Sequence, residues 1–288
     1  MDAQFYEKHH KKGLILTIII IIAAFLVIGY YYNTQGDFFK KDVSLAGGTS
    51  ITIATNEEID LEALELSLSN ELEQVSVRLL ADATTKNQQG ILIDTSATDV
   101  DAIVDVLHKH ITFDERDLSL ESTGPSLGAS FYKDLILTLI IAFVLMAVSV
   151  MISFRSFIPS VAVIAAAVMD IVVTVAILNI LSIKVAAGGI VALLLVIGYS
   201  IDTDVLLTTK MLKRTEDEPF QRLKSGAKTG LTMTITTIAA LLVAYLVSFH
   251  PLLKQMFLII IIALVVDIIA TYLMNASILY WYVTRRKK

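Results

Sequence analysis

The sequence of 288 residues contains no cysteine, and only 18% of its residues are charged, where about 25% is usual for a soluble globular protein. Without cysteine there is no disulfide framework and no metal site with thiolate ligands. Hydrophobic residues make up 55% of the chain. This balance is typical of a membrane protein and excludes a soluble enzyme with a single core.

Several functional signatures are also missing. The sequence has no basic stripe that could neutralise phosphates, so nucleic acid is not an expected partner. It has no Walker-type loop for ATP hydrolysis. The Gly-x-Gly-Asp signature of intramembrane aspartyl proteases is absent, because residues 198–202 read Gly-Tyr-Ser-Ile-Asp. We therefore predict a protein that is not an enzyme and has no cofactor and no bound metal ion.

Hydrophobic residues are concentrated in long runs. Six windows supply the roughly 20 apolar residues that a helix needs to cross a bilayer. They are residues 14–32, 135–154, 158–181, 185–209, 231–249 and 256–283. The first window is followed by no small-residue cleavage pattern, so we interpret it as a retained span and not as a signal peptide.

The stretch 33–133 is different, because it has 18 acidic and 7 basic residues. It is predicted to be a water-soluble domain between the first and second spans. Lys and Arg in the short segments number 14 on one side of the membrane and 2 on the other. By the positive-inside rule, both termini are cytoplasmic and the acidic domain is extracytoplasmic. The predicted organisation is a cytoplasmic segment 1–13, span 14–32, domain 33–133, spans within 134–283 with a cytoplasmic loop 210–228, and a basic tail 284–288.

The pattern of the acidic domain predicts its fold. Apolar and polar residues alternate over 43–55, which indicates a strand, and a helix is expected over 57–72 behind a capping box at 55–58. Further elements are strands at 75–81 and 90–94, a helix beginning near Asp99, and a strand at 118–121. The order βαββαβ is the ferredoxin-like pattern. The predicted fold class is thus a helical polytopic membrane protein with six transmembrane helices and an α+β ferredoxin-like extracytoplasmic domain.

Four acidic residues fall inside the predicted spans: Asp170, Asp202, Asp204 and Asp267. An ionisable group in a membrane is a functional hypothesis, because placing it there costs from about 2.5 to more than 10 kcal/mol. Asp202 and Asp204 project to nearly opposite faces of one helix, and we select Asp202 because it shares a face with Gly198. Polar residues follow at helical spacing, in the sets Asp267, Thr271 and Asn275; Asp170 and Thr174; and Thr229, Thr232 and Thr236. These groups could be hydrogen-bonding contacts between helices, or they could carry protons.

Taken in order, these motifs resemble the SecF branch of the SecD/SecF family, which is related to resistance-nodulation-division transporters. The resemblance covers nearly the whole chain. It rests on Gly47, Gly48 and Thr49 in the first strand, Gly124 and Pro125 before the second span, Asp170 in the third span, and Gly198, Tyr199 and Asp202 in the fourth. Many bacterial members have the fourth-span acid one place later, where this chain has Thr203, so the run 201–209 looks more like archaeal members.

The resemblance implies an accessory subunit of the Sec protein-translocation machinery in the cell membrane. It implies as partners a SecD-like subunit, the Sec channel, unfolded secretory or membrane proteins and the surrounding lipid bilayer. Export would be driven by the proton gradient, with Asp202 and Asp170 as relay candidates. Supporting polar residues would be Asp204, Asp267, Thr232, Thr236 and Lys228. The family's basic partner at the start of the fifth span corresponds to Lys228 or Thr229. Two alternatives stay open, a half-transporter for lipids or small molecules and a purely structural organiser of the channel.

Overall fold

The computed structural model describes residues 3–55, 59–81, 88–113, 116, 118–213, 218–248 and 250–286. The chain divides into two compact units. We call Met1–Lys40 together with Leu137–Lys288 the helical unit, and Lys41–Ile136 the sheet unit.

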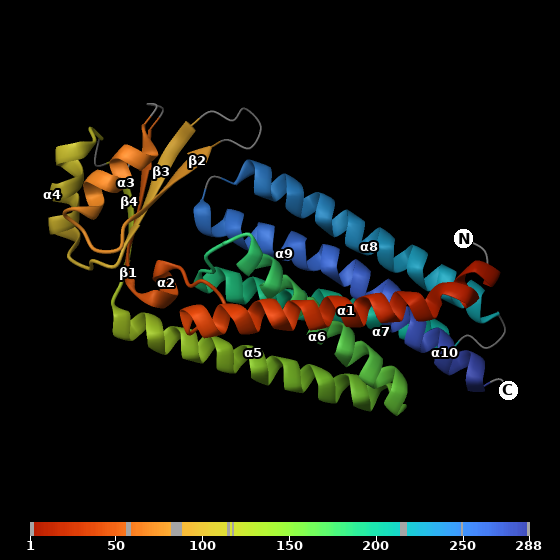
Figure 1. Cartoon of the computed structure of the whole chain (residues 1–288). Helices are drawn as coiled ribbons and strands as arrows, with labels where there is room; N and C mark the ends of the chain where they lie inside the picture. Colours follow the sequence, from red (N-terminus) through yellow and green to blue (C-terminus); the bar gives the residue numbers. More distant parts are fainter. Residues whose placement is uncertain are drawn as a thin grey trace. The chain divides into compact units, whose positions relative to one another are not determined.

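Within the described residues, six helices are long and apolar enough to cross a bilayer, as the six windows predict. The first five are α1 (Ala3–Gln35), α5 (Pro125–Phe154), α6 (Phe157–Ile180), α7 (Ala187–Lys213) and α8 (Pro219–Val247) (Figure 1). The sixth runs from α9 (Pro251–Ile269) through the π-helical turn η2 (Ala270–Asn275) into α10 (Ala276–Arg286). Both α8 and α9 begin with proline, which suits the first turn of a helix because its amide would have no partner there.

The interior of the helical unit is formed mainly by α6, α7 and α9. Small side chains let these helices approach closely, as at Ala166 of α6 and Ala270 of η2, which pack in one cluster with Ala24 of α1. The outer helices α1, α5 and α8 instead expose large apolar side chains. Examples are Ile19, Phe25, Ile141, Leu145, Val243 and Val247. Apolar surface of this kind is expected where helices contact lipid.

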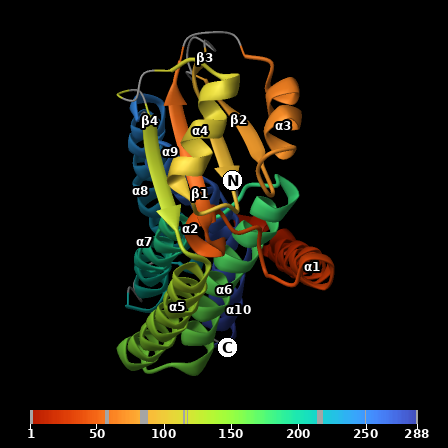
Figure 2. The same cartoon turned by 90° about the vertical axis from the view of Figure 1, so that its left-hand side faces the viewer.

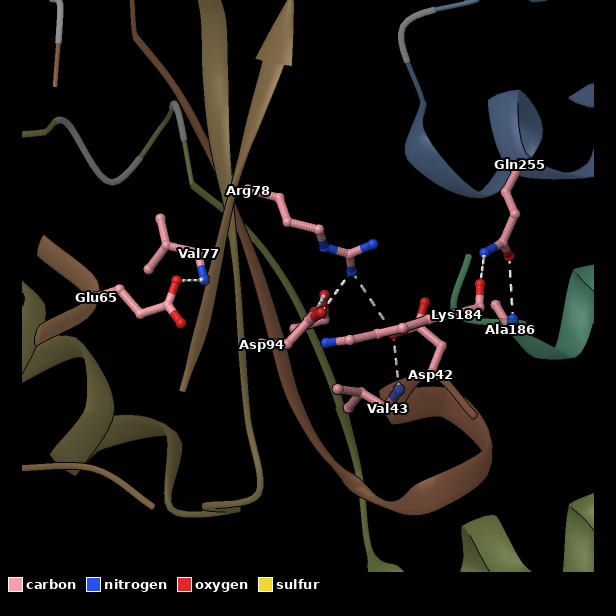
Figure 3. Close-up of polar contacts among 10 residues, drawn as sticks. Asp42, Val43, Glu65, Val77, Arg78, Asp94, Lys184, Ala186 and Gln255 are labelled. Atoms are coloured by element: carbon pink, nitrogen blue, oxygen red, sulfur yellow. Dashed lines mark hydrogen bonds and ion pairs between the residues drawn. The ribbon is translucent and has the colours of Figure 1, made fainter. Parts of the chain in front are cut away.

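A glutamine side chain fixes the start of α7 against α9. The side-chain amide of Gln255 donates to the carbonyl oxygen of Lys184, and its Oε1 accepts from the amide of Ala186 at 3.1 Å (Figure 3). Two backbone groups just before α7 are thereby satisfied, which matters in a membrane because water is not available to replace them.

The sheet unit contains four antiparallel strands in the spatial order β2-β3-β1-β4. Along the chain the elements are β1 (Gly48–Ala54), α3 (Leu61–Ser69), β2 (Ser76–Ala81), β3 (Gln88–Thr95), α4 (Val100–His110) and β4 (Leu118–Thr123). This is the predicted order of strands and helices. Figures 1 and 2 show α3 and α4 on the same face of the sheet. Alternate residues of the central strands point to that face, so Ile51 and Ile93 are buried together with Leu68 and Leu107 of the helices.

Several boundaries in the sheet unit differ from the prediction, and two of the differences have a clear structural cause. Val43–Ala46 forms a helical turn, α2, in place of the beginning of a strand, and Gly47 ends it with a φ of +87°. The strand β1 therefore begins only at Gly48. Helix α3 begins later than predicted, because the Asp60 carboxylate accepts from the amides of Glu62 and Ala63 and caps it there. Most of the predicted capping box, residues 56–58, lies outside the described residues.

Candidate functional site

Three of the four membrane acids meet in the interior of the helical unit. Asp170 of α6, Asp204 of α7 and Asp267 of α9 are almost completely buried, with relative exposures of 1%, 0% and 0%. Asp267 interacts electrostatically with both of the others. We call Asp170, Asp204 and Asp267, with the polar residues that contact them, the acid cluster.

Hydroxyl and amide groups bind the cluster from two helices. The Ser200 hydroxyl donates to Oδ2 of Asp170 at 2.5 Å. Thr271 donates to Oδ1 of Asp204 at 2.8 Å and, at 3.2 Å, to Oδ1 of Asp267. The Asn275 amide donates to the same oxygen of Asp204 at 2.7 Å. The predicted set of Asp267, Thr271 and Asn275 thus faces the interior, and it is joined to Asp204.

The local chain conformation explains this arrangement. Ser200 and Asp204 are four residues apart on α7, which places them on one face, toward α6 and α9. Thr271 and Asn275 lie in η2, where the helix widens to a π-helical turn. Such turns are rare and frequently occur at functional sites, because they shift side chains around the helix axis. Here the turn holds two donors that reach one carboxyl group.

The cluster has more hydrogen-bond acceptors than donors. In the described structure, Oδ1 of Asp170, Oδ2 of Asp204, Oδ2 of Asp267 and Oδ1 of Asn275 are buried and have no hydrogen-bond partner. Nor does any ion pair among the described residues involve the three carboxyl groups. A carboxylic acid that holds a proton is a donor and can satisfy a neighbouring oxygen, whereas a carboxylate is only an acceptor. A protonated carboxyl group in this cluster could therefore donate to one of these oxygens.

Asp202, the first relay candidate, is not in the cluster. It is exposed and lies on the opposite face of α7 from Asp204, on the same side as Gly198 and Tyr199. The structure thus brings Asp170 together with Asp204 and Asp267, which the sequence ranked as supporting residues. It places Asp202 on the outer surface of the six helices.

The predicted supporting residues of the fifth span also lie away from the cluster. Lys228, Thr232 and Thr236 are exposed on α8. The Thr232 hydroxyl donates to the carbonyl oxygen of Lys228 at 2.8 Å, and Thr236 donates to that of Thr232 at 2.9 Å. These hydroxyl groups are satisfied by their own helix. Sequence reasoning missed Ser200, although its position four residues before Asp204 is a usable signal.

The glycine motifs of the sheet unit pack against each other. A Cβ atom on Gly47 would lie 2.4 Å from Cα of Pro125, and one on Gly128 would lie 2.9 Å from the amide nitrogen of Gly47. Thr49 is buried, and its hydroxyl donates to the carbonyl oxygen of Ala97 at 2.7 Å. The motifs around Gly47 and Pro125 thus form one close backbone contact, which joins the start of β1 to the start of α5.

Charged groups on the sheet unit form exposed and half-buried pairs. Arg78 of β2 lies 2.5 Å from the buried Asp94 of β3 and 4.0 Å from Asp42 (Figure 3). Elsewhere, Nζ of Lys109 and Nε2 of His110 lie 2.9 and 3.0 Å from the two carboxylate oxygens of Glu71. The pKa of Glu71 is lowered from its ordinary value because Lys109 and then His110 bind its carboxylate. These contacts connect elements of the fold, and they are not a catalytic arrangement.

Among its described residues, the chain has six helices that are long and apolar enough to cross a membrane, and three buried acids lie among them. It also has a four-stranded sheet unit. These features are those of a polytopic membrane protein with an additional sheet-containing unit. Comparison with known proteins identifies the family. Residues 103–285 match the family described as protein export membrane protein SecD/SecF, C-terminal, and the chain belongs to this family.

Similar proteins support this assignment over most of the chain. The chain is 37% identical to the protein-export membrane protein SecF of Methanocaldococcus jannaschii over 258 residues, which cover 86% of this chain and 89% of that protein. It is 34% identical to SecF of Methanolacinia petrolearia, with 85% and 84% covered.

The fold resembles that of a solved structure. The crystal structure of SecDF, a translocon-associated membrane protein from Thermus thermophilus, matches 98% of this chain with a TM-score of 0.78. The sequences are 15% identical, so this likeness concerns the fold alone. The chain spans 38% of the length of that SecDF chain.

Proposed function

We propose that this chain is a non-enzymatic, accessory subunit of a protein-export machinery and that it works with a SecD-like membrane partner. The observation that carries the proposal is the match, over most of both chains, to relatives that are named protein-export membrane proteins. The SecDF chain of similar fold is longer, and this chain corresponds to 38% of it. A SecD-like chain would supply the other part of such an assembly.

The outer face of α7 supports a protein partner. Gly198, Tyr199 and Asp202 are exposed there, in line with the exposed apolar residues Val191 and Leu195. A carboxyl group that faced lipid would cost several kcal/mol, so membrane acids almost always face protein or water. Asp202 is therefore expected to be covered by the partner. In our proposal this face of α7 meets the SecD-like chain.

The sheet unit is proposed to be a ferredoxin-like domain on the extracytoplasmic side. The element order βαββαβ and the antiparallel strand order support the fold. The excess of Lys and Arg in the short segments supports an orientation with both termini in the cytoplasm. There the domain would meet unfolded secretory or membrane proteins emerging from the Sec channel.

The acid cluster is proposed to couple export to the proton gradient. Three buried carboxyl groups without a basic partner in the described structure cannot all be charged at a reasonable cost, so the cluster would hold protons. Asp170, which was predicted from the sequence, would act with Asp204 and Asp267. The relay role of Asp202 stays a prediction, and its exposed position favours contact with the partner.

One alternative has a specific observation in its favour. Thr271 and Asn275 bind Asp204 from another helix, which is what a purely structural, hydrogen-bonded contact between membrane helices requires. In that case the acids would organise the assembly without moving protons. Coupling of export to the proton gradient requires a titratable group at Asp170 and a gradient, whereas the structural role requires neither.

Export into membrane vesicles, with and without a proton gradient, tests the proposal. Asp170→Asn keeps the size of the side chain and removes the titratable group, and Asp105→Asn on the exposed face of α4 is the control. We expect Asp170→Asn to insert and bind its partner but to lose the gradient-dependent part of export, and we expect the same loss for Asp202→Asn. If both variants export as well as the unmodified protein, the membrane acids have the structural role and do not couple export to the gradient. Failure of a SecD-like chain to co-purify from native membranes would contradict the proposed assembly.

A further inference from the structure

An apolar groove opens on the helical unit between the beginning of α1, the first half of α8 and the segment that joins η2 to α10. Its volume is about 600 Å³. The lining residues are Tyr6, Phe220, Leu223, Lys224, Ala227, Lys228, Leu231, Tyr272, Leu273 and Ala276. None of them belongs to the acid cluster, and the proposed export function assigns the groove no role.

Two exposed lysine side chains border this apolar groove. Lys224 and Lys228 are four residues apart on α8, so they lie on the same face, and both are exposed. In the described part of the chain, neither ammonium group forms an ion pair with an acidic side chain. The Tyr272 side chain contributes apolar lining, because its hydroxyl oxygen is buried close to Gly230.

Among the described residues that line the groove, none has an acidic side chain that would oppose the lysines. The Tyr6 hydroxyl group is buried, which raises its pKa to about 12, and it adds no charge to the groove. The groove thus combines apolar walls with two exposed lysine side chains that border it. Ligand sites commonly combine a mostly apolar lining with a few convergent polar groups.

Lipid chemistry fits both parts of the groove. From Lys224 to Leu231 the lining follows α8 for seven residues, or about 10 Å along the helix axis, which is room for the first part of an acyl chain. Basic pockets between membrane helices bind the head groups of anionic lipids. We propose that this groove binds one anionic phospholipid, with its phosphate group at Lys224 and Lys228 and an acyl chain along the apolar wall toward Leu231. This proposal depends on the helical unit lying in a membrane and does not depend on the export function.

Native mass spectrometry of the full chain tests the proposal. The purified protein is mixed with equal amounts of phosphatidylglycerol and phosphatidylcholine, and the lipids that stay bound are counted. We expect one phosphatidylglycerol to be bound in preference to phosphatidylcholine. In Lys224→Gln/Lys228→Gln this preference should fall by about five-fold for each lysine, or about 25-fold for both.

Two further variants distinguish lipid binding in the groove from a general effect of positive charge. Lys8→Gln/Lys12→Gln removes two exposed lysines of α1 that do not line the groove, and it should keep the preference. Ala227→Trp places a large side chain in the groove without changing its charge, and it should release the bound lipid. Equal binding of the two lipids by the unmodified protein would overturn the proposal. An equal loss in the Lys8/Lys12 variant, or retention of the lipid in Ala227→Trp, would also overturn it.

Two outcomes distinguish other occupants. If excess inorganic phosphate displaces the bound phosphatidylglycerol, the lysines bind a soluble anion, and the lipid assignment is wrong. If the complex with a SecD-like chain carries no lipid while the separated chain does, a protein segment fills the groove in the assembly, which also contradicts the proposal. Binding of phosphatidylglycerol by both forms, with the expected response of the variants, would support it.

Discussion

The hydroxyl group of Ser200 lies 2.5 Å from Oδ2 of Asp170 and joins α7 to α6 inside the helical unit. Ser200 is completely buried and Asp170 is 1% exposed, so water cannot replace this contact. The bond therefore helps to determine which face of α7 turns inward. With this face of α7 turned inward, Asp204, one turn further along the helix, is also buried, and Asp202 is exposed.

The first prediction concerns Ser200. In Ser200→Ala the carboxyl group of Asp170 loses the hydroxyl donor at Oδ2, while its Oδ1 has no hydrogen-bond partner in the described structure. A buried polar group left without a partner costs about 1–3 kcal/mol, and we expect a loss of this size in the free energy of unfolding in detergent. Thr232→Ala is the control, since that exposed hydroxyl binds only its own helix, and its effect should be below about 0.5 kcal/mol. Equal effects of the two changes would contradict the importance of the Ser200 contact.

The second prediction concerns the contact between α8 and η2 at Gly230. A Cβ atom there would lie 2.3 Å from the Tyr272 hydroxyl oxygen and 2.9 Å from Cγ2 of Thr203. Gly230→Ala should therefore destabilise the protein by about 1–3 kcal/mol through overpacking. Adding Tyr272→Phe removes the nearest atom and should restore part of the loss. Gly198→Ala has open space and should be neutral or stabilise the isolated chain by up to about 1 kcal/mol, as measured by thermal unfolding.

Much of the fold follows from local sequence patterns. Apolar runs of sufficient length predict the six spans, and alternation with helical spacing predicts the order of elements in the sheet unit. The turn α2 could not be predicted this way, because Gly47 ends it with a positive φ where its backbone approaches Pro125, far along the chain. The beginning of α3 depends on which of several possible capping residues is used, and Asp60 takes that role.

The candidate site is predictable only in part. An acid in an apolar run is easily recognised, so all four membrane acids are found from the sequence. Whether Asp202 or Asp204 faces inward depends on the rotation of α7 about its axis, which is set by contacts such as that between Ser200 and Asp170. The π-helical turn η2 also has no clear sequence signal, although it positions Thr271 and Asn275 at Asp204.

The third prediction tests the close contact between the glycine motifs. Gly47 has a φ of +87°, and a Cβ atom there would also lie 2.4 Å from Cα of Pro125. Gly36 has a similar φ of +79° with open space around it. Gly36→Ala should show only the cost of the backbone conformation, about 1–3 kcal/mol, whereas Gly47→Ala should cost more and should expose the sheet unit to limited proteolysis. If Gly36→Ala and Gly47→Ala are equally sensitive to the protease, the contact between Gly47 and Pro125 adds nothing to the stability of the sheet unit.

The fourth prediction concerns acid stability. The pKa of Glu71 is lowered from the ordinary value of 4.5, because Lys109 and His110 bind its carboxylate. A carboxylate with a lowered pKa stabilises the fold above its ordinary pKa, and this contribution is lost as the pH falls through the lowered value. Glu71→Gln should therefore show a smaller drop in melting temperature between pH 7 and pH 3 than the unmodified protein. Asp105→Asn, an exposed acid of α4 outside this pair, should not reduce the drop.

The last prediction concerns topology. The chain has no cysteine, so a single cysteine can be placed anywhere and labelled without background. Asp105 is exposed on α4 of the sheet unit, and Lys12 is exposed near the beginning of α1. Because the short segments with 14 Lys and Arg residues should stay in the cytoplasm, Asp105→Cys should react with an impermeant maleimide in intact cells. Lys12→Cys should react only after the membrane is permeabilised. The reverse pattern would place the sheet unit in the cytoplasm, where it could not receive chains that emerge from the membrane, and the proposed export role would then need a different geometry.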